Sequence, residues 1–246
     1  MKKVLPIHDS PVSYLPGYAF TTYIILNYKT GQDWFAQKYM SSLLIYNETY
    51  DVPSTEFCNI TTIPFINIHN FQLSNIWCPL TDVHSVPRDL ISHFKIDIID
   101  FIEHYIDQNK YLVFYVNRSY IKEHDDYDVT HELLVYGYDR NRNELHICDY
   151  FKKGNLRPST CSYQEMANAF NNASEGLQLD DGGYYHFFSS EKINILSYNE
   201  LYKFEFDQTL FVKEIKYYLG LEHYNLNYKP VICDPKKIQS YLHTGV

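Results

Sequence analysis

Apolar residues recur every four positions between Pro87 and Gln108, and this is the clearest helical pattern in the chain. A spacing of three to four residues places side chains on one face of a helix. Proline suits the first turn of a helix, and Asn109 suits its end. The spacing predicts one amphipathic helix whose apolar stripe consists of Leu90, Ile91, Phe94, Ile98, Ile99, Ile102, Tyr105 and Ile106.

Three strands are predicted after this helix. Tyr111–Val116 is a short apolar run rich in aromatic and β-branched residues, which is typical of a buried strand. Leu133–Tyr136 and Leu145–Tyr150 have the same character, and residues 137–144 between them are rich in Gly, Asn, Asp and Arg. Turn residues between two such runs predict a β-hairpin.

The remaining segments predict shorter elements. Residues 1–17 are loop-like, and residues 53–80 are irregular. Residues 18–28 suit either a strand or a buried helix, because periodicity does not separate the two. Helical spacing extends over 32–46, 162–170 and 206–219, with Ser162 and Glu165 in the positions of a capping box. Further strands are expected at 184–188 and 193–198. Helices first and strands later predict an α+β fold in a single domain over residues 1–246.

Composition and charge exclude some classes of binding partner. The chain has 246 residues, 45% of them hydrophobic, and a net charge of −9. Phosphate binding needs clustered Lys and Arg, so no nucleic-acid partner is expected. An acidic carrier protein would need a local basic patch. The five cysteines show no zinc-ligand spacing and predict free thiols and no metal. No apolar run approaches the ~20 residues that span a bilayer, so we expect a cytoplasmic protein without membrane contact.

His131 and Asp149 are the main candidates for chemistry. The predicted hairpin places a residue that enters its first strand near one that leaves its second strand. An imidazole held by a carboxylate is the base and orienting group of a nucleophilic triad. The alternative is a strand histidine satisfied by local hydrogen bonds beside an ordinary strand-end carboxylate.

These residues carry a resemblance to a known family. The segment with His131, Gly137-Tyr138-Asp139 and Asp149 resembles the histidine and aspartate strands of papain-like folds such as the bacteriocin-processing cysteine peptidases. It is more similar still to the N-terminal domain of butirosin biosynthesis protein H. Asn117 and Tyr120 match the family's Asp and Tyr after a strand, with Asn where Asp is usual. The resemblance covers residues 14–150 and implies a papain-like fold of helices packed on an antiparallel sheet, which residues 151–246 complete with a late helix.

The resemblance also implies roles for individual residues. The family's cysteine nucleophile opens a helix shortly after a Gly, and Ala19 stands at that position after Gly17 and Tyr18. Ala19 is either an engineered replacement or a natural loss. Ser13 lies where papain-like enzymes often place an oxyanion-hole Gln. The substrate and oxyanion candidates are Ser13, Tyr18, Asn117 and Tyr120.

The implied reaction moves an acyl group from a carrier-protein thioester to an amine in secondary metabolism. Its partners would be an acyl or peptidyl carrier protein and a small-molecule amine acceptor. No cofactor is expected beyond the phosphopantetheine arm of the carrier, which enters as substrate. A peptidase or amidase on the same fold, and a non-catalytic binding module, remain alternatives. Cys148 precedes Asp149 on a strand, so it faces the opposite side and is expected in the core. The segment of His124, Asp125 and Asp126 is expected to be a loop beside the site.

Overall fold

The computed structural model describes residues 1–9, 16–40, 78–124, 129–151, 156–173 and 191–218. The chain divides into two compact units. Unit 1 comprises Met1–Gln32 and Gln72–Lys203, and unit 2 comprises Asp33–Phe71 and Phe204–Val246. Unit 1 holds all the described strands and every described candidate residue. That the chain forms a single domain stays a prediction.

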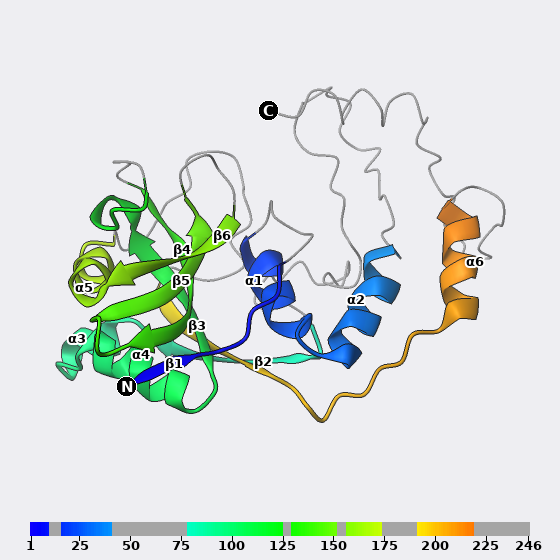
Figure 1. The fold of residues 1–246 in the computed structure, drawn as a ribbon, viewed down its shortest axis with the longest axis horizontal. Helices are drawn as coiled ribbons and strands as arrows, with labels where there is room; N and C mark the ends of the chain where they lie inside the picture. Colours follow the sequence, from blue (N-terminus) through cyan, green and yellow to red (C-terminus); the bar gives the residue numbers. More distant parts are fainter. Residues whose placement is uncertain (10–15, 41–77, 125–128, 152–155, 174–190, 219–246) are drawn as a thin grey trace, which may run out of the picture. The chain divides into compact units, whose positions relative to one another are not determined.

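Unit 1 is built on an antiparallel sheet, so the fold is α+β (Figure 1). The strand order is β2-β7-β3-β4-β5-β6, and β1 pairs with β4 off this path. The strands are β1 (Lys2–Val4), β2 (Thr81–Pro87), β3 (Tyr111–Asn117), β4 (Thr130–Asp139), β5 (Glu144–Tyr150), β6 (Leu156–Ser162) and β7 (Lys192–Tyr198). β3, β4 and β5 lie in the middle of the sheet, and almost all their residues are buried.

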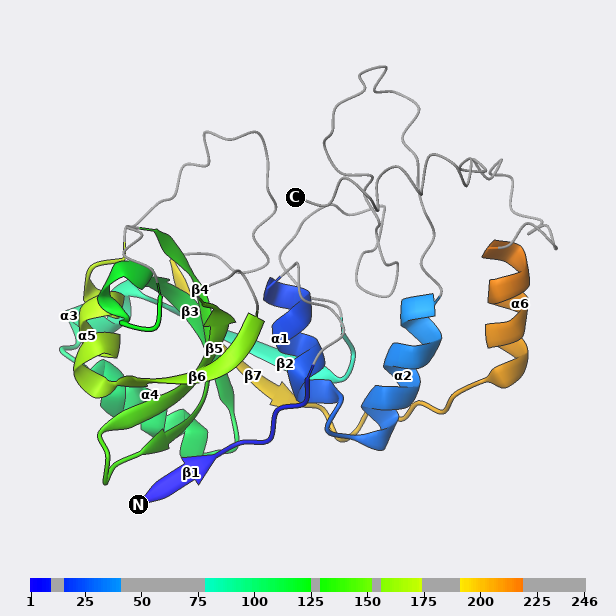
Figure 2. The same cartoon turned by 45° about the horizontal axis from the view of Figure 1, so that its top comes forward.

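Helices cover both faces of this sheet. The helices of unit 1 are α1 (Pro16–Ile25), α3 (Asp89–His93), α4 (Ile98–Asp107), α5 (Tyr163–Asn171) and the 3-10 helix η2 (Arg118–Tyr120). Phe170 of α5 packs edge-on against Phe114 of β3, with ring centroids 5.6 Å apart. The Tyr23 hydroxyl of α1 donates to the carbonyl of Leu156 and contacts Cys148. The sheet thus separates α1 from α4 and α5 (Figures 1 and 2).

Two further helices complete the described elements. α2 (Lys29–Met40) begins in unit 1 and continues into unit 2, and α6 (Gln208–Tyr218) belongs to unit 2. Within unit 2, the backbone N–H of Asp207 donates to the Gln37 side chain over 2.9 Å. No described helix is long and apolar enough to cross a membrane.

Gly137 allows β1 to join the sheet. Val4 pairs with Gly137, just after an irregularity in the β4–β5 register. A Cβ at position 137 would lie 2.8 Å from the Lys3 carbonyl oxygen and 2.9 Å from the Val4 Cα. Both atoms are backbone and cannot rotate away, so the close approach of β1 requires glycine here.

The prediction of one helix over 87–108 was wrong. Two helices, α3 and α4, stand in its place, and Pro87 ends β2. Lys95 has a φ of 52°, in the left-handed region, which breaks the helix. Asp97 then starts α4 by accepting hydrogen bonds from the backbone N–H groups of Ile99 and Asp100. Phe94, expected on the buried stripe, is 64% exposed because it lies at the break.

Other predictions are confirmed. The segment 18–28 is helical over most of its length, as part of α1, and Ala19 lies in its first turn. The three central strands lie where expected. Ser162 and Glu165 form the predicted capping box at the start of α5. β1, β2 and β6 were not predicted, and the strand expected at 184–188 lies outside the described residues.

Candidate functional site

The sheet brings His131 and Asp149 to the same face. β4 and β5 are neighbours, and Leu134 stands opposite Cys148 in their register. Side chains alternate along a strand, so His131 and Asp149 both lie on the face opposite to this pair. His131 stands near the start of β4, opposite Val116, and its side chain is 27% exposed. Asp149 is completely buried.

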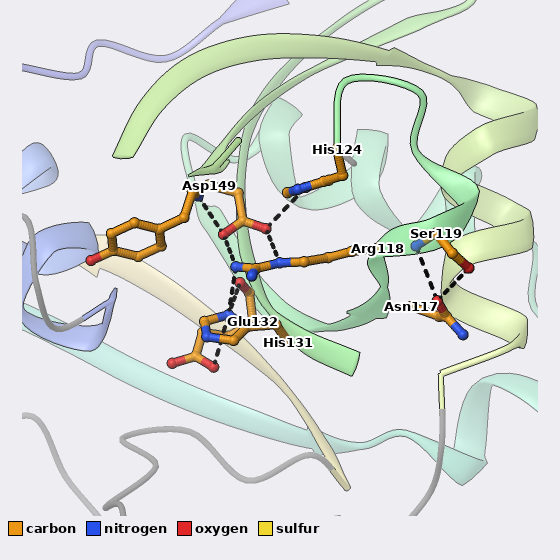
Figure 3. A network of polar contacts seen from close by, with 8 residues as sticks. Asn117, Arg118, Ser119, His124, His131, Glu132 and Asp149 are labelled. Atoms are coloured by element: carbon orange, nitrogen blue, oxygen red, sulfur yellow. Dashed lines mark hydrogen bonds and ion pairs between the residues drawn. The ribbon is translucent and has the colours of Figure 1, made fainter. Parts of the chain in front are cut away.

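Arg118 lies between the two predicted residues (Figure 3). It belongs to η2, directly after β3. Its Nε donates to Asp149 Oδ2 over 3.0 Å, and its Nη2 donates to Oδ1 over 2.5 Å. The same Nη2 lies 2.8 Å from His131 Nδ1. The guanidinium therefore occupies the place of the direct hydrogen bond that the hairpin led us to expect between His131 and Asp149.

A second imidazole contacts the same carboxylate. His124 Nε2 lies 3.2 Å from Asp149 Oδ2, and its side chain is almost fully buried. Its ring packs against Phe151 with centroids 4.5 Å apart. The backbone N–H of Tyr150 donates to Asp149 Oδ1 over 2.7 Å. Arg118 and His124 thus hold the carboxylate from two sides.

These contacts keep Asp149 ionised. Burial by itself raises the pKa of a carboxyl group. At Asp149 this largest effect is outweighed by the contact with His124 and by the charge of Arg118, so the pKa of Asp149 is lowered. The carboxylate and the guanidinium form a buried ion pair.

The contact with Arg118 takes a nitrogen that a catalytic triad would use. A guanidinium donates hydrogen bonds and does not accept them, so His131 Nδ1 is the acceptor in this contact. In a triad the same nitrogen donates to the aspartate. His131 Nδ1 also lies 3.1 Å from the Glu132 carbonyl oxygen.

Ala19 is completely buried in the first turn of α1. Its carbonyl accepts a hydrogen bond from Thr22 Oγ1 over 2.8 Å. That Ala19 faces His131 across a cleft stays a prediction. Ser13 lies outside the described residues, as does the side chain of Tyr18.

Asn117 and Tyr120 have local positions at the end of β3. Asn117 Oδ1 accepts hydrogen bonds from the backbone N–H and the hydroxyl of Ser119 and so caps η2. Its Nδ2 donates to the Asn172 carbonyl. Figure 3 shows Asn117 and Ser119 apart from the contacts of His131 and Asp149. Tyr120 is 40% exposed. The structure gives Asn117 a supporting role between β3 and the end of α5.

The described thiols are not placed to act as nucleophiles. Cys78, Cys148 and Cys161 are free and buried. Burial raises the pKa of Cys78 to about 12 and also raises the pKa values of Cys148 and Cys161. Thiols of this kind carry little reactive thiolate at neutral pH. Cys58 and Cys233 lie outside the described residues. Among the described residues, no group of His, Cys, Asp and Glu could hold a metal ion.

Three residues of the site were not singled out as site residues from the sequence. Arg118 and His124 lie in the connection between β3 and β4, where period-based patterns carry no signal. Glu132 could have been recognised from the sequence, because it is the one acidic residue in the apolar run that begins β4. Its side chain is 4% exposed, and its Oε2 lies 3.4 Å from His131 Nδ1.

Comparisons of the chain with models of protein families, with curated proteins and with solved structures gave no match.

Proposed function

We propose that the chain is a papain-like acyl-transfer scaffold with Ala19 at the position of the nucleophile. With a thiol at that position, it would move an acyl group from a carrier-protein thioester to an amine. The resemblance of the His131–Asp149 segment carries the reaction class. The observation that supports it is the placement of His131 and Asp149 on one face of adjacent strands, beside a buried charge network.

The site suits recognition of an acyl group. The His131 side chain is partly exposed, and its Nε2 can donate to a carbonyl oxygen when it carries the ring proton. The helix N-terminus at α1 offers backbone N–H groups near position 19. With alanine at position 19, the chain would bind a carrier-protein thioester without forming a covalent intermediate. The carrier would present its phosphopantetheine arm, and the setting would be cytoplasmic secondary metabolism.

One observation favours a second candidate, a binding module with no native turnover. Arg118 occupies His131 Nδ1, the nitrogen that would have to donate to Asp149 in a working triad. A site that retained catalysis would need Arg118 to withdraw from His131. A site that only binds would keep the contact.

Replacing Ala19 with Cys tests the proposal. A helix N-terminus and a nearby imidazolium both lower a thiol pKa from its usual ~8.5. We expect iodoacetamide to alkylate this thiol about tenfold faster than the thiol of Ala169→Cys. Ala169 is the matched control, because it is also completely buried and lies on α5. His131→Ala should slow alkylation at position 19 and leave it unchanged at position 169.

Acylation then separates the functions. Incubation of Ala19→Cys with an acyl carrier-protein thioester should add the mass of the acyl group to the intact protein. Transfer of that group to an added amine identifies a transferase, and its loss to water identifies a peptidase or amidase. If the thiols at positions 19 and 169 are alkylated at equal rates and Ala19→Cys is not acylated, the acyl-transfer function is wrong and the binding module is the remaining candidate.

A further inference from the structure

Glu132 is a buried carboxylate with an unused oxygen. It lies on β4, directly opposite Tyr115 of β3. The Tyr115 hydroxyl donates a hydrogen bond to this carboxylate. Glu132 Oε2 is buried and has no hydrogen-bond partner among the described residues. Buried polar groups normally find a partner, so this oxygen points to a donor that the described part of the chain does not supply.

The neighbouring donors are committed elsewhere. Arg118 directs its Nε to Asp149 and its Nη2 to Asp149 and His131. His131 Nδ1 lies 3.4 Å from Glu132 Oε2 without a hydrogen bond to it, and the same nitrogen lies closer to Arg118 Nη2, at 2.8 Å. Figure 3 shows Glu132 on the other side of His131 from Asp149. The two carboxylates therefore have separate partners.

Tyr150 adds a second unpartnered oxygen. Its hydroxyl is buried and has no hydrogen-bond partner in the described part of the chain. Its ring stands edge-on to His131, with centroids 6.4 Å apart. Burial, and then the charges of Asp149 and Glu132, raise the pKa of Tyr150. The hydroxyl therefore stays neutral and lies within the field of Glu132.

The local charges favour a cation. Arg118 forms an ion pair with Asp149. Glu132 lies 3.4 Å from His131 Nδ1, and no Lys or Arg of the described residues forms an ion pair with it. A ligand for this place needs positive charge and several N–H donors, one for the carboxylate and one for the phenol oxygen. A primary ammonium group has three such donors.

We propose that Glu132 and Tyr150 form a subsite for a primary ammonium group. In the proposed reaction, the ammonium group would belong to the amine acceptor, and this identification of the ligand rests on the proposed function. The existence of the subsite does not rest on the proposed function. Glu132 supplies the charge and Tyr150 a hydroxyl oxygen, while Tyr115 holds the carboxylate in place.

Binding of n-butylammonium to the full chain tests this subsite. The side-chain resonances of His131 and Tyr150 would be followed by NMR during titration at pH 7, with 1-butanol as the neutral probe. We expect saturable shifts with n-butylammonium and none with 1-butanol. Glu132→Gln keeps the size of the side chain and should weaken binding at least tenfold, and Tyr150→Phe should weaken it several-fold.

Glu103→Gln is the matched control. Glu103 is also buried, but it lies on α4, where it pairs with Arg140 and accepts a hydrogen bond from Tyr163. Its variant should bind n-butylammonium like the unmodified chain. Equal shifts with 1-butanol, unchanged binding in Glu132→Gln, or no saturable binding in the unmodified chain would each overturn the subsite. If Glu132→Gln does not fold, unchanged binding in Tyr150→Phe overturns it.

The two proposals fail in different ways. The titration needs no thiol at position 19 and no carrier protein. If Ala19→Cys is not acylated but n-butylammonium binds through Glu132, the acyl-transfer function is wrong and the subsite stands. If Ala19→Cys is acylated but n-butylammonium does not bind, the subsite is wrong and the function stands.

Discussion

At the scale of single residues, Asp149 shows how a buried charge depends on its partners. The carboxylate is completely buried and is held by Arg118, His124 and the Tyr150 backbone. Removing one member of a buried ion pair leaves the other charge without compensation, which typically costs more than the pair contributes. Arg118 is itself only 15% exposed, so water compensates little of its charge.

Asp149→Asn should therefore lower the free energy of unfolding at pH 7 by about 3 kcal/mol. Urea unfolding followed by circular dichroism measures this change. Asp89→Asn is the control, because Asp89 is exposed on α3, and it should change the stability by less than about 0.5 kcal/mol. A loss as small as that of the control would contradict the buried ion pair.

The same variant has a predictable pH dependence. The folded-state pKa of Asp149 is lowered, so its contribution to stability is present above the unfolded value of ~3.9. This contribution is lost as the pH falls through the lower, folded-state pKa. The stability difference between the unmodified chain and Asp149→Asn should be constant above pH ~5 and shrink on acidification below pH ~4. A difference that grows on acidification would contradict the lowered pKa.

The predicted hairpin placed His131 near Asp149, and the structure puts both on one face of adjacent strands. The sequence did not indicate which residues contact them. Arg118 was not found, because a long side chain reaches partners that its own sequence position does not indicate. Whether Ala19 belongs to the same site depends on contacts that the Ala19→Cys experiment probes.

At the scale of elements, the capping box of α5 links local sequence to stability. Ser162 Oγ accepts from the backbone N–H of Glu165, and the Glu165 carboxylate accepts from the backbone N–H of Ser162. Ser162→Ala removes a helix cap and should cost about 1 kcal/mol in the free energy of unfolding. Ser92→Ala on α3 is the matched control, since Ser92 is exposed and caps no N-terminus. Equal effects in thermal unfolding would show that the cap is not stabilising.

Gly137 tests the attachment of β1 to β4. Gly137→Ala would force the new Cβ against the backbone of Lys3 and Val4 and should destabilise the chain by about 1–3 kcal/mol. In a chain that lacks residues 1–4, the same substitution should cost much less, because the clashing atoms are gone. Denaturant unfolding of the four proteins measures the coupling. If Gly137→Ala destabilises the chain equally without residues 1–4, the loss of stability does not come from the clash with β1.

The elements that the sequence did not predict share a physical reason. β2 and β6 end the path of strands and have one strand neighbour each. An edge strand tolerates exposed polar residues, and Pro158 is acceptable in β6 for the same reason. Their patterns therefore lack the apolar run that identified β3. The break at Lys95 was missed because apolar spacing continues through it.

At the scale of the whole molecule, the two units predict which truncations the sheet survives. A chain ending at Lys203 keeps all the described residues of unit 1 and removes the C-terminal part of unit 2. Amides of β3, β4 and β5 should retain their protection from hydrogen exchange. A chain ending at Glu191 also loses β7, which lies between β2 and β3, and should lose that protection. Equal protection in both truncated chains, or loss in the first, would contradict this division.

The sequence by itself determined the central strands, the helix that carries Ala19 once the resemblance was applied, the capping box and the shared face of His131 and Asp149. These features depend on neighbours a few residues apart, through strand alternation and helix capping. The tertiary structure decided what those residues contact. Arg118 and His124 reach Asp149 from η2 and the residues that follow it, and Glu132 Oε2 has no hydrogen-bond donor among the described residues. Such contacts depend on the path of the chain in space, which residue spacing does not encode.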